Sequence, residues 1–311
     1  MQTRRAFLAT ASAAAASAAA PMKLPTASSQ QFIVAMLTML DAHGNLDDTL
    51  NKDYLAFLEA GGADGVLVMG TTGEFASFSI KERKQALEST LKHRGKLSVM
   101  CQCGASNIPE TLELIAHAGA AGADSILVVP PYYYKNPSVD GLAAFYEPLL
   151  HAAKLPVLLY NIPQTSGAPI TPDLLRRLSS FERLYGMKDS YSKPDAMLAF
   201  IREFTKLKML TGVPGNIETN IKNSGAGAVT GNGSVFLKET SAIFEAQRTG
   251  GDVHAAQQRL NEVSGVLTAY DGIPAMKYLL GRRGLKESGV RPPFVPLSSA
   301  QRGELSQKLR S

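Results

Sequence analysis

Residues 125–129 read Ser-Ile-Leu-Val-Val, and residues 156–159 read Pro-Val-Leu-Leu. Both runs are apolar at nearly every position instead of at every second position. Strands that are buried on both faces of a parallel sheet have this pattern. The two runs therefore predict an α/β fold in which helices cover a parallel sheet.

Runs of this kind recur through most of the chain, and helical segments such as 49–60 lie between most of them. They start near Phe32, Gly65, Leu97, Ser125, Pro156, Leu184, Lys208 and Ala226. Eight such strand–helix units predict a (β/α)8 TIM barrel. A doubly wound open sheet is the competing arrangement, and it is less favoured because no glycine-rich dinucleotide turn follows the first run.

The length of 311 residues suits one barrel with an appendage, since barrels of about 250 residues form single domains. We expect the barrel over residues 32–236. Residues 237–311 are predicted to form additional C-terminal helices that pack on it, over 237–247, 253–270, 274–280 and 299–309.

The first twenty residues differ from the rest of the chain. Arg4 and Arg5 precede an Ala/Ser-rich run without acidic residues, which is typical of a twin-arginine signal peptide over 1–20. Residues 21–31 are then a linker. This predicts a periplasmic protein exported by the twin-arginine machinery, with no membrane association after cleavage. A chance arginine pair is the alternative.

The formal net charge is +5, and about +3 remains without the two leader arginines. The basic residues are scattered along helical segments and form no cluster. Nucleic acid is therefore not an expected partner, and a small-molecule substrate is.

A single lysine stands where another apolar run ends. Residues 184–190 read Leu-Tyr-Gly-Met-Lys-Asp-Ser, which places Lys188 at the point where a buried strand opens onto a loop. Desolvation lowers a lysine pKa, and an uncharged amine can attack a carbonyl carbon to form a Schiff base. A snorkelling lysine at a strand end is the simpler alternative.

Three other predicted strand ends carry hydroxyl or phenol groups. They are Gly70-Thr71-Thr72-Gly73-Glu74, Tyr132-Tyr133-Tyr134 and Tyr160-Asn161-Ile162-Pro163. The glycine-flanked turn offers hydroxyls and backbone N–H groups to a small carboxylate. Each motif alone can be an ordinary turn or strand exit. Together with Lys188 they lie at the C-terminal strand ends, where barrel enzymes place their reacting groups.

These motifs, in this order, resemble those of the dihydrodipicolinate synthase / N-acetylneuraminate lyase family of pyruvate-dependent class I aldolases. The resemblance extends from about residue 31 to the C-terminus. It implies that Lys188 forms the imine with a 2-keto acid and that Tyr160 moves the proton. Thr71 would link Tyr160 to a second phenol, Tyr133, which reaches across a subunit interface in a homotetramer.

The resemblance also implies a set of substrate contacts. Thr72, flanked by Gly70 and Gly73, would hold the carboxylate, and the stretch 227–232 would border the imine through Val229 and Gly231. The imine itself is the electron sink, so the resemblance implies neither a cofactor nor a metal.

One departure from the family pattern bears on the substrate. Pro163 is followed by Gln164-Thr165-Ser166-Gly167, where dihydrodipicolinate synthases usually carry an arginine for a substrate carboxylate. Without it a charge-assisted pair of about 1.5–3 kcal/mol is lost. Thr165 and Ser166 suit a hydroxylated substrate, so we expect an aldolase or dehydratase acting on a 2-keto-3-deoxy sugar acid or related compound. The alternatives are 4-hydroxy-tetrahydrodipicolinate synthase and a non-catalytic exported sugar-acid binding protein.

Overall fold

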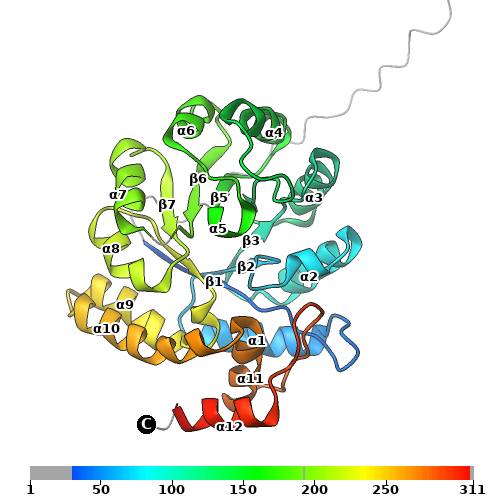
Figure 1. Ribbon diagram of the computed structural model, residues 1–311, viewed down its shortest axis with the longest axis vertical. Helices are drawn as coiled ribbons and strands as arrows, with labels where there is room; N and C mark the ends of the chain where they lie inside the picture. Colours follow the sequence, from blue (N-terminus) through cyan, green and yellow to red (C-terminus); the bar gives the residue numbers. More distant parts are fainter. Residues whose placement is uncertain (1–29, 192, 309–311) are drawn as a thin grey trace, which may run out of the picture.

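The computed structural model, which describes residues 30–191 and 193–308, is a closed barrel of eight parallel strands. The strands follow one another around the barrel in chain order, with each pair of neighbours hydrogen-bonded (Figure 1). They are β1 (Gln31–Ala35), β2 (Gly65–Val68), β3 (Ser98–Gln102), β4 (Ser125–Val128), β5 (Val157–Asn161), β6 (Leu184–Asp189), β7 (Lys208–Thr211) and β8 (Gly227–Thr230). The predicted TIM barrel is confirmed, and each strand begins within one residue of its predicted start.

Helices surround the barrel and cover the outer faces of the strands (Figure 1). They are α1 (Asp48–Ala60), α2 (Ile80–His93), α3 (Ile108–Ala121), α4 (Val139–Ala152), α6 (Pro172–Leu178), α7 (Pro194–Glu203), α8 (Ile217–Lys222) and α9 (Leu237–Thr249). The short α5 (Pro163–Ser166) follows β5 directly and lies over the centre of the barrel in Figure 1. Single 3-10 turns lie at Phe75–Ser77, Pro214–Asn216, Asn232–Ser234 and Gly265–Ala269.

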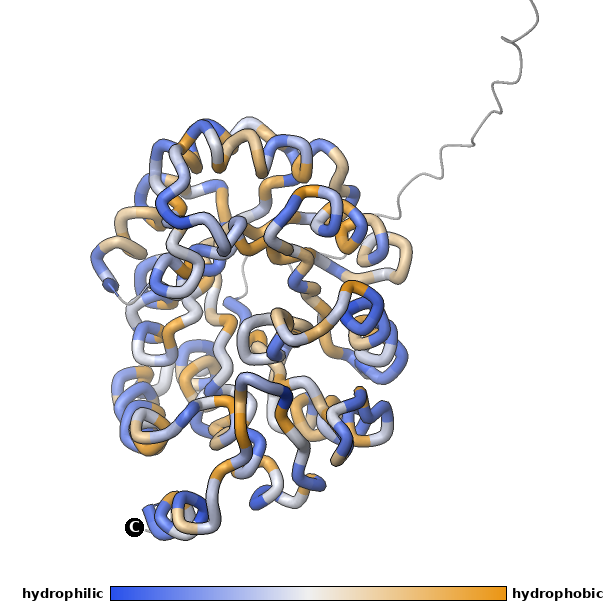
Figure 2. The backbone as a smooth tube through the Cα atoms, turned by 45° about the vertical axis from the view of Figure 1, so that its right-hand side comes forward, coloured by the Kyte–Doolittle hydropathy of each residue, from blue (hydrophilic) through white to orange (hydrophobic). Residues whose placement is uncertain are grey.

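The helices are amphipathic, and Figure 2 shows hydrophilic and hydrophobic residues alternating along them. In α1, for example, Leu50, Tyr54, Leu55 and Leu58 are buried. Their spacing of three to four residues places them on one side of the helix. That side packs on the barrel, and the opposite side stays in water.

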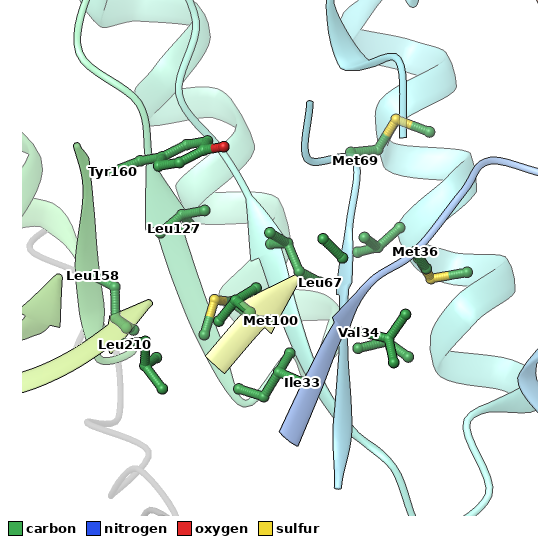
Figure 3. Close-up of a cluster of buried hydrophobic side chains, with 14 of the residues drawn as sticks. Ile33, Val34, Met36, Leu67, Met69, Met100, Leu127, Leu158, Tyr160 and Leu210 are labelled. Carbon is green, nitrogen blue, oxygen red and sulfur yellow. The ribbon is translucent and has the colours of Figure 1, made fainter. Parts of the chain in front are cut away.

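Side chains fill the barrel interior, so the barrel is a packed core and the reacting groups can lie only at its ends. Leu67, Met100, Leu127, Leu158 and Leu210 are buried there. Figure 3 shows these side chains converging from several strands, with Tyr160 beyond Leu127 and Leu158 at one end of the cluster. Tyr160 therefore marks the carboxyl end of the barrel.

The predicted division of the chain after residue 236 falls before the helix of the eighth unit. Phe244 of α9 stacks on Phe32 of β1, with ring centroids 5.5 Å apart. This contact closes the helical ring, so α9 belongs to the barrel. The appendage consists of α10 (Val253–Ser264), α11 (Gly272–Arg282) and α12 (Ser299–Lys308), which lie on the α1 side of the barrel in Figure 1.

The predicted signal peptide over 1–20 and most of the predicted linker lie outside the described residues. The last linker residue, Gln31, is already part of β1. None of the helices within 30–191 and 193–308 combines the length and hydrophobicity that crossing a membrane requires.

Candidate active site

Lys188 and Tyr160 are neighbours across two strands. They are register partners on β6 and β5, and paired residues of adjacent strands project from the same face. Both side chains are buried, and Lys188 Nζ donates a hydrogen bond of 3.2 Å to the Tyr160 hydroxyl. The same nitrogen lies 4.2 Å from the centroid of the Tyr160 ring. The structure thus holds an amine and a phenol in proton-transfer distance.

Gly212, just after β7, leaves room for this amine. A Cβ at position 212 would lie 2.9 Å from Lys188 Cε and 2.0 Å from Ser190 Oγ. Any larger residue would have to displace one of these side chains. Glycine at position 212 therefore leaves the space that the side chains of Lys188 and Ser190 occupy.

The Tyr160 hydroxyl is tuned by its neighbours. Burial by itself would raise the pKa of Tyr160, but the positive charge of Lys188 and hydrogen bonds with Thr71, Ser190 and Lys188 outweigh it and lower the pKa below its usual value. A phenol with a lowered pKa gives up and takes back a proton more readily at neutral pH. The surroundings favour an acid–base role.

Ser190 was not predicted from the sequence to be a partner of Tyr160. It stands two residues after Lys188, and residues two apart along a strand share a face. That periodicity was the signal that could have identified it.

Polar residues on the opposite face of the same strand ends hold the strands together. Asn161 Nδ2 donates 2.9 Å to Asp189 Oδ1, and Asn161 Oδ1 accepts from the backbone N–H of Ile170 at 3.0 Å. Burial raises the pKa of Asp189, and hydrogen bonds from Tyr191 N–H and Asn161 partly offset this. These groups brace the ends of β5 and β6, from which Tyr160 and Lys188 project.

The turn 70–74 brings its first threonine to Tyr160. Thr71 Oγ1 lies 3.4 Å from the Tyr160 hydroxyl, so Thr71, Tyr160 and Lys188 form one hydrogen-bonded chain. Thr72 approaches the end of β8, because a Cβ on Gly231 would lie 2.7 Å from Thr72 Oγ1. Residues predicted from three motifs therefore meet at one place.

Some of the backbone N–H groups that were expected to bind a carboxylate are bonded within the turn itself. The N–H groups of Gly73 and Glu74 donate to the carbonyls of Gly70 and Thr71, at 3.0 Å each. Gly73 also packs against Thr38, whose hydroxyl donates 2.6 Å to the Gly73 carbonyl. The donors that suit a carboxylate are then the hydroxyl of Thr72 and the N–H groups of Thr71 and Thr72.

The other predicted substrate residues differ in how they are placed. Thr165 is exposed beside Thr71, but the Ser166 hydroxyl is buried, donating to the Ile162 carbonyl and accepting from Ala168 N–H. The expectation that Ser166 offers its hydroxyl to a substrate is therefore wrong: the main chain around α5 uses it. Val229 is buried within β8 and pairs with Ile33.

Tyr133, the predicted second phenol, lies on the surface of the single chain. Its side chain is 76% exposed and touches Tyr134 edge-on, with ring centroids 5.2 Å apart. Tyr134 is equally exposed, at 79%. Two tyrosines thus project from the loop between β4 and α4.

A buried ion pair connects the turn to the C-terminal appendage. Glu74, which has a left-handed backbone (φ 59°), places Oε1 2.6 Å from Nζ of Lys277 on α11, and its Oε2 accepts from Arg291 N–H at 3.0 Å. The two side chains are 0% and 2% exposed. Burial lowers the pKa of Lys277, and the Glu74 carboxylate opposes this.

This ion pair was not predicted from the sequence. A single charge inside the apolar run 273–280 was its signal, because a buried lysine needs a partner. The pair fixes the left-handed end of the turn that carries Thr71 and Thr72.

A cavity of about 210 Å³ opens beside Thr71. Its apolar walls come from four parts of the chain: Phe75, Val129, Tyr132, Ile162, Pro293 and Phe294. In residues 30–191 and 193–308, no three His, Cys, Asp or Glu side chains gather as metal ligands would.

The fold and the site define a class: a (β/α)8 barrel that carries a buried lysine and a tyrosine side by side at its carboxyl end. Residues 28–311 match the model of the dihydrodipicolinate synthetase family, and the chain belongs to that family. Its members are pyruvate-utilising lyases for which a lysine Schiff base is the general mechanism.

Named relatives agree with this assignment. An uncharacterized DapA-like lyase of Chloroflexus aurantiacus is 38% identical over 275 residues, which cover 86% of this chain and 92% of the relative. A 4-hydroxy-tetrahydrodipicolinate synthase of Phenylobacterium zucineum is 33% identical, covering 83% and 90%.

Among solved structures, a prophage protein of the dihydrodipicolinic acid synthase family from E. coli K12, in complex with pyruvate, superposes with a TM-score of 0.86. It is 27% identical and covers 90% of this chain and 97% of its own. A dihydrodipicolinate synthase from Bacillus anthracis gives 0.85 at 26% identity, covering 91% and 98%.

Proposed function

We propose that this protein is a lyase that forms an imine between Lys188 and pyruvate or another 2-keto acid, and makes or breaks a bond at the neighbouring carbon. The observation that carries the proposal is the 3.2 Å hydrogen bond between Lys188 Nζ and the Tyr160 hydroxyl at the barrel end. Family membership supports the same chemistry.

The chemistry follows from this geometry. The amine of Lys188 adds to the keto carbon, and the carbinolamine loses its oxygen as water to give the imine. Tyr160 supplies the proton to the departing oxygen and recovers it when the next bond is made or broken. Thr71 holds the phenol in place, and Thr72 with its adjoining N–H groups binds the carboxylate.

The experiment is reductive trapping. Borohydride added with pyruvate should attach one pyruvyl unit to the intact chain, and peptide mapping should find it at Lys188. Lys188→Ala should carry no adduct, whereas Lys193→Ala, which changes an exposed lysine, should carry the full adduct. An unmodified wild-type chain refutes the proposal.

The sugar-acid form of this proposal depends on Thr165, because the Ser166 hydroxyl is bonded to the main chain. The activity is tested by release of pyruvate from 2-keto-3-deoxygluconate and N-acetylneuraminate, with loss of water scored separately. Binding of these acids without any turnover would favour the non-catalytic binding protein.

The second candidate is 4-hydroxy-tetrahydrodipicolinate synthase, which the name of the Phenylobacterium relative favours. Against it, Gln164 donates to the Ser190 carbonyl at 2.9 Å, and Lys135 Nζ donates to the carbonyls of Tyr132 and Ser166. Gln164 is neutral, and the Lys135 ammonium is already bonded to main-chain carbonyls. Neither side chain therefore offers a free cation to a second carboxylate. Turnover of pyruvate with aspartate semialdehyde would establish this candidate.

We also propose that the protein is exported to the periplasm through its Arg4-Arg5 leader. Its family contains oligomeric members, and a homotetramer is our proposal for this chain. Replacing Arg4 and Arg5 by lysine should retain the protein in the cytoplasm, as judged by cell fractionation. Periplasmic accumulation of that variant would exclude the twin-arginine route.

A further inference from the structure

Asp189 is a buried acid that the proposed mechanism does not use. It is 2% exposed and stands between Lys188 and Ser190, which both bond to the Tyr160 hydroxyl. Because neighbouring residues of a strand point to opposite faces, its carboxyl lies behind the strand, away from Lys188. An isolated buried charge is costly, so the contacts of this carboxyl have to explain how it is accommodated.

The residues beside Asp189 on the adjacent strands are polar and neutral. Asn161 of β5 and Thr211 of β7 are its register partners, and both are buried. The Thr211 hydroxyl is bonded within its own turn, donating to the Val213 carbonyl at 3.3 Å and accepting from Val213 N–H at 3.1 Å. Asn161 is therefore the side chain of this row that binds Asp189.

The two carboxyl oxygens of Asp189 differ in their surroundings. Oδ1 accepts from Asn161 Nδ2 at 2.9 Å and from Tyr191 N–H at 3.0 Å. Oδ2 is buried and has no hydrogen-bond partner in the part of the chain that the structure describes. An ionised carboxylate spreads its charge over both oxygens, so a buried oxygen without a donor is unfavourable. A protonated carboxyl suits this arrangement, because its carbonyl oxygen accepts and its hydroxyl oxygen needs no donor.

No positive charge in the surroundings offsets an ionised Asp189. The buried side of α7, which packs against β7, consists of Met197, Phe200 and Ile201. Burial raises the pKa of Asp189, and only hydrogen bonds from Tyr191 N–H and Asn161 act against this, with no contribution from a charged group among residues 30–191 and 193–308. The charges around the carboxyl thus agree with its hydrogen bonds.

The backbone on both sides of Asp189 is bonded to the neighbouring strands. Its carbonyl accepts from Gly212 N–H at 2.7 Å, and the next N–H, that of Ser190, donates 2.8 Å to the Asn161 carbonyl. The side-chain bond to Tyr191 N–H closes the turn that follows. The Asp189 side chain is therefore a third attachment for a segment that two strands already hold.

We propose that Asp189 is a positioning residue for Lys188 and Ser190 and that it performs this role as an uncharged carboxyl. Its side chain holds the backbone from which these two residues reach the Tyr160 hydroxyl. Because it is uncharged, it places no negative charge behind a site that receives an anionic 2-keto acid. The positioning role rests on the proposed imine chemistry, whereas the charge state of Asp189 does not.

The first experiment compares two replacements in the full-length protein. Asp189→Asn keeps an acceptor oxygen for Asn161 and Tyr191 and is uncharged at every pH, whereas Asp189→Ala removes the acceptor. We expect borohydride trapping of pyruvate to be at least tenfold slower in Asp189→Ala and within about threefold of the wild type in Asp189→Asn. Asp195→Ala, which changes an exposed residue in the first turn of α7, is the control and should match the wild type.

Two results would overturn the positioning role alone. One is trapping that is equally fast in all variants, and the other is trapping that is equally impaired in Asp189→Asn and Asp189→Ala. Absence of the adduct from the wild type would overturn the proposed function and the positioning role together. The comparison of the wild type with Asp189→Asn stands even where Asp189→Ala does not fold.

The second experiment needs no substrate and tests the charge of Asp189. The folding equilibrium constant of the wild type, divided by that of Asp189→Asn, is measured by denaturant titration across pH. This ratio should fall by up to about tenfold per pH unit above 3.8, the ordinary pKa of the group, because the folded chain keeps a proton that the unfolded chain releases. The fall should continue up to neutral pH, and Asp195→Asn in place of Asp189→Asn should show no such fall. A ratio that is constant, or that levels off before neutral pH, overturns the inference and leaves the proposed function standing.

Discussion

Lys188 and Tyr160 are register partners on adjacent strands, and their reactive atoms are 3.2 Å apart. The pairing belongs to the sheet itself, so the backbone positions from which the amine and the phenol project are held by hydrogen bonds between strands and not by a loop. Such placement on strands gives a more precise site than loops do.

Tyr160→Phe removes the proton carrier but keeps the ring on which Lys188 Nζ rests. We expect kcat to fall by about 10²- to 10⁴-fold with the fold unchanged, because general acid–base catalysis contributes that much. Steady-state kinetics on the best substrate of the panel measures this. Tyr185→Phe, at the opposite end of β6, should retain wild-type rates, and a fully active Tyr160→Phe would remove the phenol from the mechanism.

Gly212→Ala places a methyl group against Lys188 Cε and Ser190 Oγ. Because Ser190 and Lys188 must shift to make room, we expect pyruvate trapping and turnover to fall at least tenfold, as a misplacement of about 1 Å can cost far more. Gly215→Ala is the matched control, since its nearest neighbouring atom would be 3.7 Å away. Unchanged trapping in both variants would contradict the proposed constraint.

Lys277→Met leaves the Glu74 carboxylate buried without its cation. We expect the free energy of unfolding to fall by about 3–5 kcal/mol, measured by denaturant titration. Adding Glu74→Gln should restore part of it, because no buried charge then remains. Lys84→Met breaks the partly exposed pair with Glu113 and should cost about 0–1 kcal/mol. A loss that small at Lys277 would mean that the pair contributes little.

The pH dependence of stability should include a contribution from Glu82. The hydrogen bond from Arg291, above all, lowers the pKa of Glu82 from 4.5 to about 2. A lowered folded-state pKa gives stability that is complete above pH 4.5 and is lost as the pH falls through 2.

Glu82→Gln should therefore lower Tm near neutral pH, and its difference from the wild type should shrink steadily as the pH falls below about 4.5. Thermal melts across this range give the comparison. Ser79 caps the N-terminus of α2, and its N–H and hydroxyl donate to Glu82 Oε2. A difference that is independent of pH would assign the effect to these bonds instead of the charge.

Tyr133→Phe tests whether a subunit interface completes the site. If the partner subunit's Tyr133 reaches Thr71 as proposed, the variant should lose activity by about 10²-fold while light scattering still reports a tetramer. Tyr134→Phe is the adjacent control and should remain active. A monomeric wild-type protein with full activity would refute the cross-interface role.

Most of the fold and the centre of the candidate site could be predicted from the sequence. Continuous apolar runs identified the strands, and the rule that parallel strands end at one edge brought together Thr71, Tyr160 and Lys188. Contacts between residues that are far apart in the chain could not be predicted. The pairing of Glu74 with Lys277 and the cover that Phe294 gives the cavity depend on how α10–α12 fold back on the barrel.

The direction in which a small side chain points could not be predicted from the sequence either. Thr165 and Ser166 are adjacent hydroxyl residues and both line the cavity, yet Thr165 is exposed whereas the Ser166 hydroxyl is buried and bonded to the main chain around α5. Only the local backbone conformation distinguishes them.

The ion pair between Glu74 and Lys277 has a consequence for how the protein is made. A nascent chain on the ribosome that has not yet reached residue 277 contains all eight strands and the lysine–tyrosine pair, but its turn 70–74 holds a carboxylate, that of Glu74, without its cation. In such a chain the left-handed conformation of Glu74 lacks the ion pair that stabilises it. The turn 70–74 therefore gains its full stability only after α11 has been synthesised and has packed on the barrel.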